Sequence, residues 1–276
     1  MAKAEGKGRT ALVTGASAGL GVAFAETLAK RGFALVLTAR RADRLDALAE
    51  DLRKRFAVAV EVIPADLADP KAPADLVAAI AARGIQVDML VNNAGFGVPP
   101  AYENTTWEDQ RDLIQVMVTA PAELTHRLLP GMIARRWGRI LNVASLAAFV
   151  PAIPGSTLYA GAKSFVVRFS EFLAAEVRGK GVHVLATCPG FTRTEFHASA
   201  GIAEVAKAIP GWQWQSAEVV AEEAVAAVMA GRESVLVNGT ANKATAGLIK
   251  YLPGFVLRRM AARHPLAKRA ETKERG

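Results

Sequence analysis

Residues 10–30 read TALVTGASAGLGVAFAETLAK, and this stretch decides the fold. It begins with a short apolar run, Thr10 to Thr14, of the kind that forms a buried strand. It ends with a segment of helical period, Val22 to Lys30. Between the two lie three glycines in the spacing GxxxGxG. The stretch therefore predicts a strand, a tight turn and a helix in immediate succession.

The glycine-rich turn has two interpretations. Glycines permit a tight turn, close approach of the backbone to a pyrophosphate, and close packing of the helix on the strand. The helix N-terminus adds unpaired N–H groups and the positive end of the helix dipole. Gly15, Gly19 and Gly21 thus indicate a nucleotide phosphate site. Because strand-to-helix turns that bind nothing also contain glycines, the turn alone leaves both interpretations open.

The same alternation continues along the chain. Apolar runs of strand length are separated by helix-period segments, which predicts an α/β fold with one doubly wound parallel sheet and helices on both faces. The predicted strands are 10–14, 33–38, 58–63, 87–92, 138–143, 182–187 and 234–237, and the predicted helices are 22–30, 42–55, 73–82, 106–136, 159–178 and one that starts near 216.

The composition fits a globular protein. The 276 residues are 51% hydrophobic and 22% charged, enough to bury a sizeable core. We expect one domain over residues 1–276, with a core of about 9–240. The single cysteine excludes a disulfide framework, and the four histidines lack metal-ligand spacing, so we expect no metal. The polar start, MAKAEGKGRT, lacks an apolar signal segment, and we expect a cytoplasmic location.

The net charge of +8 is concentrated in one segment. Residues 250–276 carry eight Lys and Arg against two Glu, whereas the preceding 249 residues are close to neutral. This basic extension, about 240–276, lacks a nucleic-acid motif, and we expect no nucleic-acid partner. Its apolar residues are expected to pack on a neighbouring subunit or the pocket mouth. Peripheral contact with an anionic membrane is the less favoured alternative, because Pro253 and Gly254 interrupt an amphipathic helix.

The end of the second predicted strand bears on cofactor choice. An acidic residue there would bond the ribose hydroxyls of NAD, but the chain reads Thr38-Ala39-Arg40-Arg41. A guanidinium at this place suits the 2′-phosphate of NADP, with Arg40 the better candidate. The alternative is a solvated basic helix start, since Arg44 continues the run.

A possible reaction centre lies in the second half of the chain. Tyr159 and Lys163 are spaced i, i+4 on a predicted helix and share one face. An ammonium beside a phenol is expected to lower the pKa of Tyr159, so that the phenol can exchange a proton while a hydride moves. Ser145 follows a predicted strand, where its hydroxyl would bond a substrate oxygen.

Taken together, residues 9–240 resemble the short-chain dehydrogenase/reductase family, which has a Rossmann fold. The matching segments are TGASAGLG at Thr14, PADLAD around Asp66, NNAG at Asn92, Ser145, YAGAK at Tyr159 and PGFTRT at Pro189. The resemblance implies an NADP(H) site and a homodimer or homotetramer. It assigns cofactor contacts to Gly15, Ser17, Gly19, Leu20, Gly21, Asp66, Leu67, Asn93, Ala94, Gly95, Tyr159, Lys163, Pro189, Gly190, Thr192 and Thr194. Catalysis is assigned to Ser145, Tyr159 and Lys163.

One position departs from the family. Relatives usually carry an asparagine in the fifth helix that stabilises a kink and holds a water linked to the lysine. The family spacing places Met117 there, and a thioether cannot take that role. We expect hydride transfer to persist, with the proton resupplied by another route or more slowly, unless Met117 is simply a core-packing residue. The alternative is a dinucleotide-binding sensor or scaffold of low catalytic competence.

The connection of about 190–215 is long and apolar for a loop, which is typical of a substrate lid. The apolar positions expected near the pocket are Phe96, Phe149, Val150, Ile153, Phe191, Phe196, Ile202, Trp212 and Trp214. An apolar pocket beside two hydroxyls fits a small lipophilic ketone or secondary alcohol. The alternative is that these side chains only anchor the loop to the core.

Overall fold

A seven-stranded parallel sheet is the centre of the structure, a computed structural model that describes residues 5–97, 102–151, 157–195, 209–249, 251–253, 255–257 and 259. The strand order is β3-β2-β1-β4-β5-β6-β9, and every neighbouring pair is parallel. The strands are β1 (Thr10–Thr14), β2 (Ala34–Thr38), β3 (Val60–Val62), β4 (Met89–Asn92), β5 (Gly138–Val143), β6 (Val182–Cys188) and β9 (Val235–Val237).

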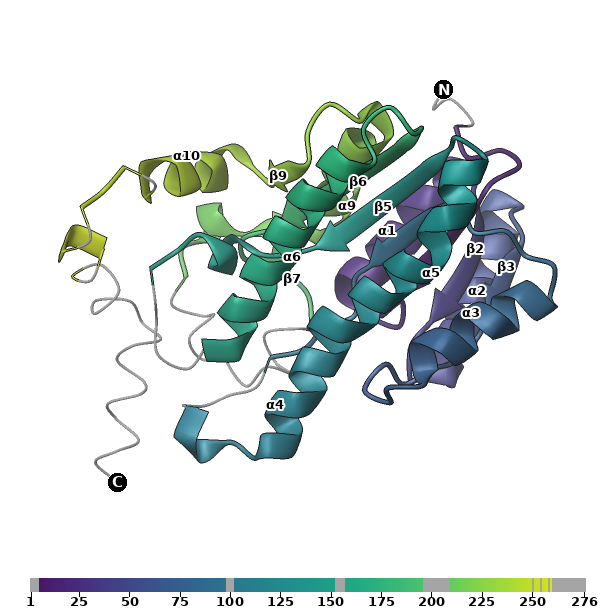
Figure 1. Cartoon of the computed structure of the whole chain (residues 1–276), viewed down its shortest axis with the longest axis horizontal. Helices are drawn as coiled ribbons and strands as arrows, with labels where there is room; N and C mark the ends of the chain where they lie inside the picture. Colours follow the sequence, from purple (N-terminus) through teal and green to yellow (C-terminus); the bar gives the residue numbers. More distant parts are fainter. Residues whose placement is uncertain are drawn as a thin grey trace.

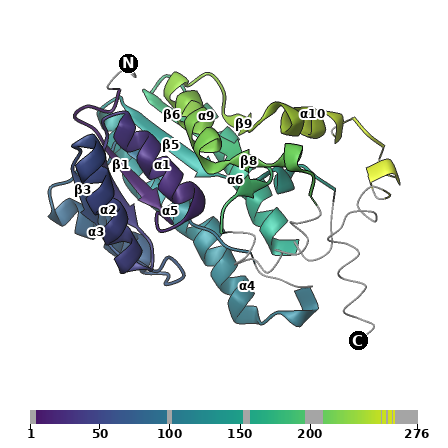
Figure 2. The same ribbon diagram turned by 180° about the vertical axis from the view of Figure 1, so that it is seen from behind.

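Helices cover both faces of this sheet (Figures 1 and 2). On one face pack α1 (Gly19–Lys30), α2 (Ala42–Phe56) and α9 (Ala217–Ala230). On the other pack α3 (Ala72–Ala82), α5 (Ala120–Ala134) and α6 (Thr157–Glu176). The predicted doubly wound α/β fold is therefore confirmed.

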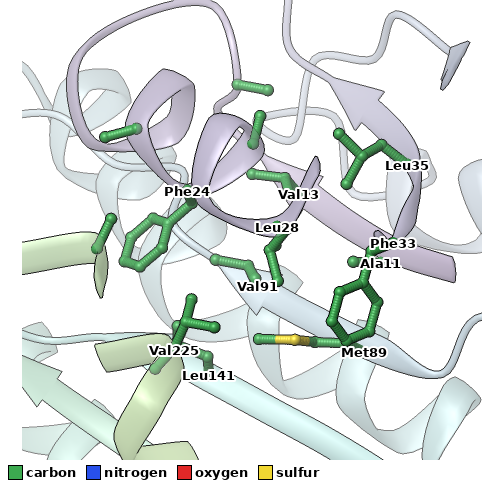
Figure 3. Packing of buried hydrophobic residues seen from close by; sticks show 14 of the residues in the cluster. Ala11, Val13, Phe24, Leu28, Phe33, Leu35, Met89, Val91, Leu141 and Val225 are labelled. Atoms are coloured by element: carbon green, nitrogen blue, oxygen red, sulfur yellow. The ribbon is translucent and has the colours of Figure 1, made fainter. Parts of the chain in front are cut away.

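Alternation along each strand supplies both cores. In β1, for example, Val13 faces the helices on one side while Leu12 faces those on the other. Figure 3 shows Phe24 and Leu28 of α1 packed over side chains of the strands beneath them. Full burial of such a side chain contributes about 1.5–3 kcal/mol to folding, so this contact fixes α1 on the sheet.

Most predicted elements lie within two residues of the observed ones. The main difference is the long helix expected over 106–136. It is divided into α4 (Trp107–Ile114), a π-helical turn η2 (Gln115–Thr119) and α5. The N–H of Ala120 donates to the carbonyl of Gln115, five residues back. Pro121 has no N–H to continue the regular ladder, which gives a physical reason for the wider turn.

The connection of about 190–215, predicted as a lid, has regular structure at its two ends. Strand β7 (Thr192–Arg193) pairs in parallel with β8 (Gln215–Ser216), so the two ends of the connection are joined. A short 3-10 turn, η4 (Gly211–Gln213), precedes β8. Residues 196–208, including Phe196 and Ile202, lie outside the described residues, as does Ile153.

The C-terminal region continues from β9 into α10 (Thr240–Ile249), which projects from the edge of the sheet (Figure 2). Leu248, Tyr251 and Phe255 are large apolar residues that are 60%, 80% and 66% exposed. Residues 260–276 lie outside the described residues. Among the helices that are described, none has the length and apolarity to cross a bilayer.

We expect Phe24→Ala to lower the free energy of unfolding by about 3–5 kcal/mol, because Phe24 is fully buried and truncation leaves a cavity. Urea denaturation followed by circular dichroism measures this change. Val219→Ala is the control, since its side chain is 49% exposed. The stabilising role of Phe24 packing would be contradicted if Phe24→Ala and Val219→Ala had the same midpoint of urea denaturation.

Candidate active site

The predicted site residues gather at the carboxyl edge of the sheet. Strands β1 and β4 are neighbours there, and the chain reverses its order across the sheet between them. In open α/β sheets this reversal leaves a crevice at the carboxyl ends of the strands, where ligands bind. The glycine-rich turn follows β1, and the chain segment that begins with Asn93 follows β4.

Close approach of chain segments makes glycine necessary in the turn. Gly15 has a φ of +66°, and a Cβ there would lie 2.8 Å from the Cα of Ala94. A Cβ at Gly21 would lie 2.1 Å from the carbonyl oxygen of Gly15. Side chains at these positions would push the turn away from α1 or from the end of β4.

The N-terminus of α1 lies at this edge of the sheet, and the N–H of Gly21 donates to the carbonyl of Ala18 at 3.1 Å. The helix begins at Gly19, three residues earlier than predicted, and its N-cap is Ala18, which has no side-chain oxygen to accept from its first N–H groups. Leu20 lies in this first turn. Unpaired N–H groups and the helix dipole make the position suitable for a phosphate.

Asn93 holds the turn rather than projecting into the crevice. Its Nδ2 donates to the carbonyl oxygens of Thr14 at 2.9 Å and Gly15 at 3.2 Å. The Oγ1 of Thr14 accepts from the backbone N–H of Asn93 at 3.0 Å and of Ala94 at 3.1 Å. Asn93 therefore acts on the crevice through the shape of the glycine turn.

Arg41, which the sequence placed second to Arg40, is the arginine that contacts the glycine turn. Its Nη2 donates to the Oγ of Ser17 at 3.1 Å, and its Nη1 lies 3.9 Å from Glu195. Arg40 is exposed, with no contact to the turn among those the structure shows. Glu195 also pairs with Arg44 at 3.0 Å. The end of β2 therefore presents a cluster of guanidinium groups beside Ser17.

Asp66 and Leu67 lie beyond β3 on the same edge. The Oδ1 of Asp66 accepts from the N–H of Ala68 at 3.1 Å, which holds the exposed carboxylate in place. Leu67 is buried and lines a small cavity under the crevice.

Ser145, Tyr159 and Lys163 lie together as predicted. Ser145 follows β5, and its Oγ accepts from the N–H of Ala147 at 3.1 Å. Tyr159 is half-buried on α6 and hydrogen-bonded to Ser145. The Nζ of Lys163 lies 5.6 Å from the centre of the Tyr159 ring and donates to the carbonyl of Val143 at 2.8 Å.

Burial has the largest effect on the pKa values of Tyr159 and Lys163. Desolvation raises the pKa of Tyr159, and its hydrogen bond with Ser145 acts in the opposite direction. The expectation that Lys163 brings the pKa of Tyr159 below its usual value is wrong for this structure, because desolvation outweighs the influences that lower it. Desolvation lowers the pKa of Lys163 itself to about 8.

A loop after β6 completes the edge. The carbonyl of Pro189 accepts from the N–H of Leu146 at 2.8 Å, which ties this loop to the Ser145 segment. A Cβ at Gly190 would lie 2.5 Å from the Nδ2 of Asn242, so α10 packs directly behind the loop. Thr192 is buried, and its Oγ1 donates to the carbonyl of Gly190 at 3.2 Å.

Thr194 lies against the glycine turn. A Cβ at Gly19 would lie 3.0 Å from the Cβ of Thr194, so the loop after β6 closes over the start of α1. The predicted contacts after β6 and in the glycine turn therefore border one crevice.

The apolar positions expected near the pocket are divided. Phe191 and Trp214 contact each other with ring centres 5.6 Å apart, and Trp212 is 69% exposed. Phe96 packs against the cluster that includes Met117, as does Tyr159, and Phe149 packs against a cluster under β6 and β9.

Two groups of polar residues were assigned no role from the sequence. Asn92 and Asn142, opposite each other on β4 and β5, form a buried hydrogen bond of 2.8 Å. Asn238 and Asn242 join β6, β8 and α10. Asparagine is a common turn residue at the end of a strand, so these residues give no distinctive signal in the sequence. Only the pairing of the strands in the folded sheet brings them together. Within the described parts of the chain, no group of His, Cys, Asp and Glu has metal-binding geometry.

Known proteins resemble this chain in sequence and structure. The family model described as short chain dehydrogenase matches residues 9–204. Serine 3-dehydrogenase of Agrobacterium fabrum is 37% identical over 189 residues, which cover 68% of this chain and 73% of that protein. Very-long-chain 3-oxoacyl-CoA reductase-B of Danio rerio is 34% identical over 203 residues, which cover 71% of this chain and 63% of that protein.

Solved structures extend the similarity. A short-chain dehydrogenase from Sphingobium yanoikuyae, in complex with NADPH, is 32% identical and superposes with a TM-score of 0.77. The match covers 89% of this chain and 96% of that one.

We expect Lys163 to titrate near pH 8, because burial disfavours its ammonium form. The measurement is the ¹³Cε chemical shift of labelled lysine as a function of pH, with the resonance identified by its loss in Lys163→Gln. A midpoint near the ordinary lysine value of about 10.4 would contradict the burial described above.

Proposed function

The chain belongs to the short-chain dehydrogenase/reductase family, and we propose that it interconverts a hydrophobic ketone and its secondary alcohol with NADP(H). The observation that carries this proposal is the grouping of Ser145, Tyr159 and Lys163 beside the glycine-rich turn. Two hydroxyls and an ammonium at one edge of a dinucleotide-type crevice are suited to moving a proton while hydride is transferred.

The residues present fit a dinucleotide. The uncapped start of α1 and the turn of Gly15, Ser17, Gly19, Leu20 and Gly21 would hold the pyrophosphate. Asp66 and Leu67 would border the adenine, and Ala94 and Gly95 the middle of the cofactor. Pro189, Gly190, Thr192 and Thr194 would border the nicotinamide, and Lys163 its ribose.

The arginines after β2 support NADP over NAD. Arg41 at Ser17, with Arg40 and Arg44 nearby, supplies positive charge where a 2′-phosphate would lie, and guanidinium groups bind phosphate with charge-assisted hydrogen bonds. The NADPH complex of the Sphingobium yanoikuyae relative supports the same choice.

Bound NADPH supplies the hydride, and the proton is handled by the chain. The Oγ of Ser145 accepts from Ala147 and is hydrogen-bonded to Tyr159, and with a substrate bound its O–H would donate to the carbonyl oxygen. Tyr159 would give its phenolic proton to the developing alkoxide. A raised pKa keeps the phenol protonated at neutral pH, as a proton donor requires.

The proposed substrate class rests on the apolar side chains of the connection 190–215. Phe191 and Trp214 form an aromatic pair at the start and end of the connection 190–215, and β7–β8 pairing holds the two ends together. We propose that this connection covers a lipophilic substrate. The relatives named above act on alcohol or carbonyl compounds of different polarity, so they support the reaction type more than the substrate.

The sensor or scaffold alternative is not favoured. It was suggested by Met117, but Met117 leaves Ser145, Tyr159 and Lys163 in a shared site with Lys163 bonded to Val143. The replacement affects the surroundings of Lys163 rather than the reacting hydroxyls.

Assembly as a homodimer or homotetramer is proposed through α4, α5 and α6. On α6 the rings of Phe165 and Phe169 stack with centres 5.7 Å apart, and Phe172 is 61% exposed. An exposed aromatic face on one long helix is typical of a surface covered by another subunit.

We expect Tyr159→Phe to lower kcat for NADPH-dependent ketone reduction by about 100-fold or more, because the proton donor is removed. Activity is measured by NADPH oxidation with a panel of hydrophobic ketones, keto-steroids and ketoacyl thioesters. Binding of NADPH, followed by fluorescence, should be retained. Full turnover by Tyr159→Phe would contradict the assignment of the proton donor.

We expect Arg41→Ala to weaken NADPH binding by about tenfold or more while leaving NADH binding within about twofold, because one charge-assisted phosphate contact is lost. Titration of each variant with both cofactors measures the ratio. Arg40→Ala is the matched comparison and decides which of the two arginines sets the preference. An unchanged NADPH to NADH ratio in both variants would contradict the location of the phosphate site.

A further inference from the structure

The arginines after β2 are paired with a carboxylate from the second half of the chain. The Nη1 of Arg44 lies 3.0 Å from a carboxylate oxygen of Glu195, and the Nη1 of Arg41 lies 3.9 Å from the same oxygen. Arg41 is the N-cap of α2 and Arg44 lies in its first turn, whereas Glu195 follows β7. These ion pairs therefore join the start of α2 to the segment that leads into the connection 190–215.

Arg41 lies between Glu195 and the glycine-rich turn. On one side its Nη2 and Nε donate to the Oγ of Ser17 at 3.1 Å and 3.3 Å, and on the other its Nη1 faces the carboxylate. The residue before Glu195 is Thr194, which packs on the start of α1, since a Cβ at Gly19 would lie 3.0 Å from the Cβ of Thr194. Glu195 is thus held beside the place proposed for the 2′-phosphate, and both anions need the same guanidinium group.

The ion pairs of Glu195 are of the kind that another anion can replace. The side chains of Arg41 and Arg44 are 44% exposed, and that of Glu195 is 63% exposed. Ion pairs this open to water are weak, because solvent screens them and ordering long side chains costs entropy. A phosphate monoester carries a charge of about −1.5 to −2 at pH 7 and accepts paired hydrogen bonds from guanidinium groups. It is therefore the stronger partner for these arginines.

We propose that Glu195 is a specificity-determining residue, which competes with the 2′-phosphate of NADP(H) for Arg41 and Arg44. The inference rests on the proposed function, in which these arginines bind that phosphate. NADP(H) has to replace Glu195 at the guanidinium groups, and the displaced carboxylate, still close by, repels the bound phosphate. NAD(H) has a hydroxyl in place of the phosphate and leaves the ion pairs as they are. Glu195 thus reduces the preference for NADP(H) that the arginines create.

A supporting role for Glu195 would have the opposite effect. If its carboxylate oriented Arg41 toward the phosphate, removing the carboxylate would weaken the binding of NADPH. The bonds from Arg41 to Ser17 hold that guanidinium group without help from Glu195, so competition is the effect that we expect to dominate. The sign of the change in affinity separates the two roles.

The experiment titrates Glu195→Gln with two pairs of ligands that differ in the 2′-phosphate. One pair is NADPH and NADH, and the other is adenosine 2′,5′-bisphosphate and adenosine 5′-monophosphate, which lack the nicotinamide. Glutamine keeps the size of the side chain and removes its charge. Dissociation constants are measured by calorimetry or fluorescence at low ionic strength, where charges are screened least.

The matched control is Asp51→Asn. Asp51 lies on α2, as Arg44 does, and forms an exposed ion pair of 2.6 Å with Arg55, which keeps a second carboxylate partner in Glu26 at 3.0 Å. This variant removes one negative charge from the same helix but from a pair that does not include Arg41 or Arg44. It therefore separates local competition from a change in net charge.

We expect Glu195→Gln to bind NADPH and adenosine 2′,5′-bisphosphate about threefold to fivefold more tightly than the wild type, which is the scale of an exposed ion pair. Its binding of NADH and adenosine 5′-monophosphate should stay within about twofold, because these ligands do not compete with the carboxylate. Asp51→Asn should match the wild type with all four ligands.

The outcomes separate this inference from the proposed function. If the wild type prefers NADPH and Glu195→Gln binds it no more tightly, or if Asp51→Asn gains as much, competition by Glu195 is overturned while the cofactor assignment stands. If the wild type does not prefer NADPH, the NADP(H) part of the proposed function is contradicted. A preference gained in Glu195→Gln would then still support competition, and the lack of any preference in both proteins would overturn it.

Discussion

The clamp between Thr14 and Asn93 is the contact on which the site depends. The Thr14 hydroxyl accepts from two consecutive backbone N–H groups after β4, and the Asn93 amide donates back to two carbonyls of the glycine turn. These four hydrogen bonds join the ends of β1 and β4 where the sheet reverses its order. With the strands held there, the start of α1 lies at this edge of the sheet, and Gly15 and Gly21 must remain without side chains.

The reacting groups depend on a second set of contacts around β5 and β6. Lys163 is held by the carbonyl at the end of β5, and the loop at Pro189 is bonded to Leu146 beside Ser145. Because the sheet and α6 exclude water here, burial controls the protonation of both Tyr159 and Lys163. The same packing that orders these side chains thus sets their acid–base behaviour.

Met117 lies in the π-helical turn η2. The kink that an asparagine usually stabilises is present without it, and Pro121, which lacks an N–H, accounts for the irregular ladder. The substitution therefore leaves the path of the backbone intact. What it changes is the chemistry beside Lys163, where the Met117 thioether and a small cavity lie.

The sequence by itself determined the order of strands and helices, the doubly wound sheet and the grouping of the glycine turn with Ser145, Tyr159 and Lys163. The elements and the doubly wound sheet follow from local periodicity and turn chemistry, whereas the grouping of the site residues was implied by the resemblance to the family. Only the tertiary structure decided that Arg41 contacts Ser17, that burial raises the pKa of Tyr159, and that Asn92 pairs with Asn142. Each of these depends on residues far apart in the chain and on how completely packing excludes water, which no local pattern encodes.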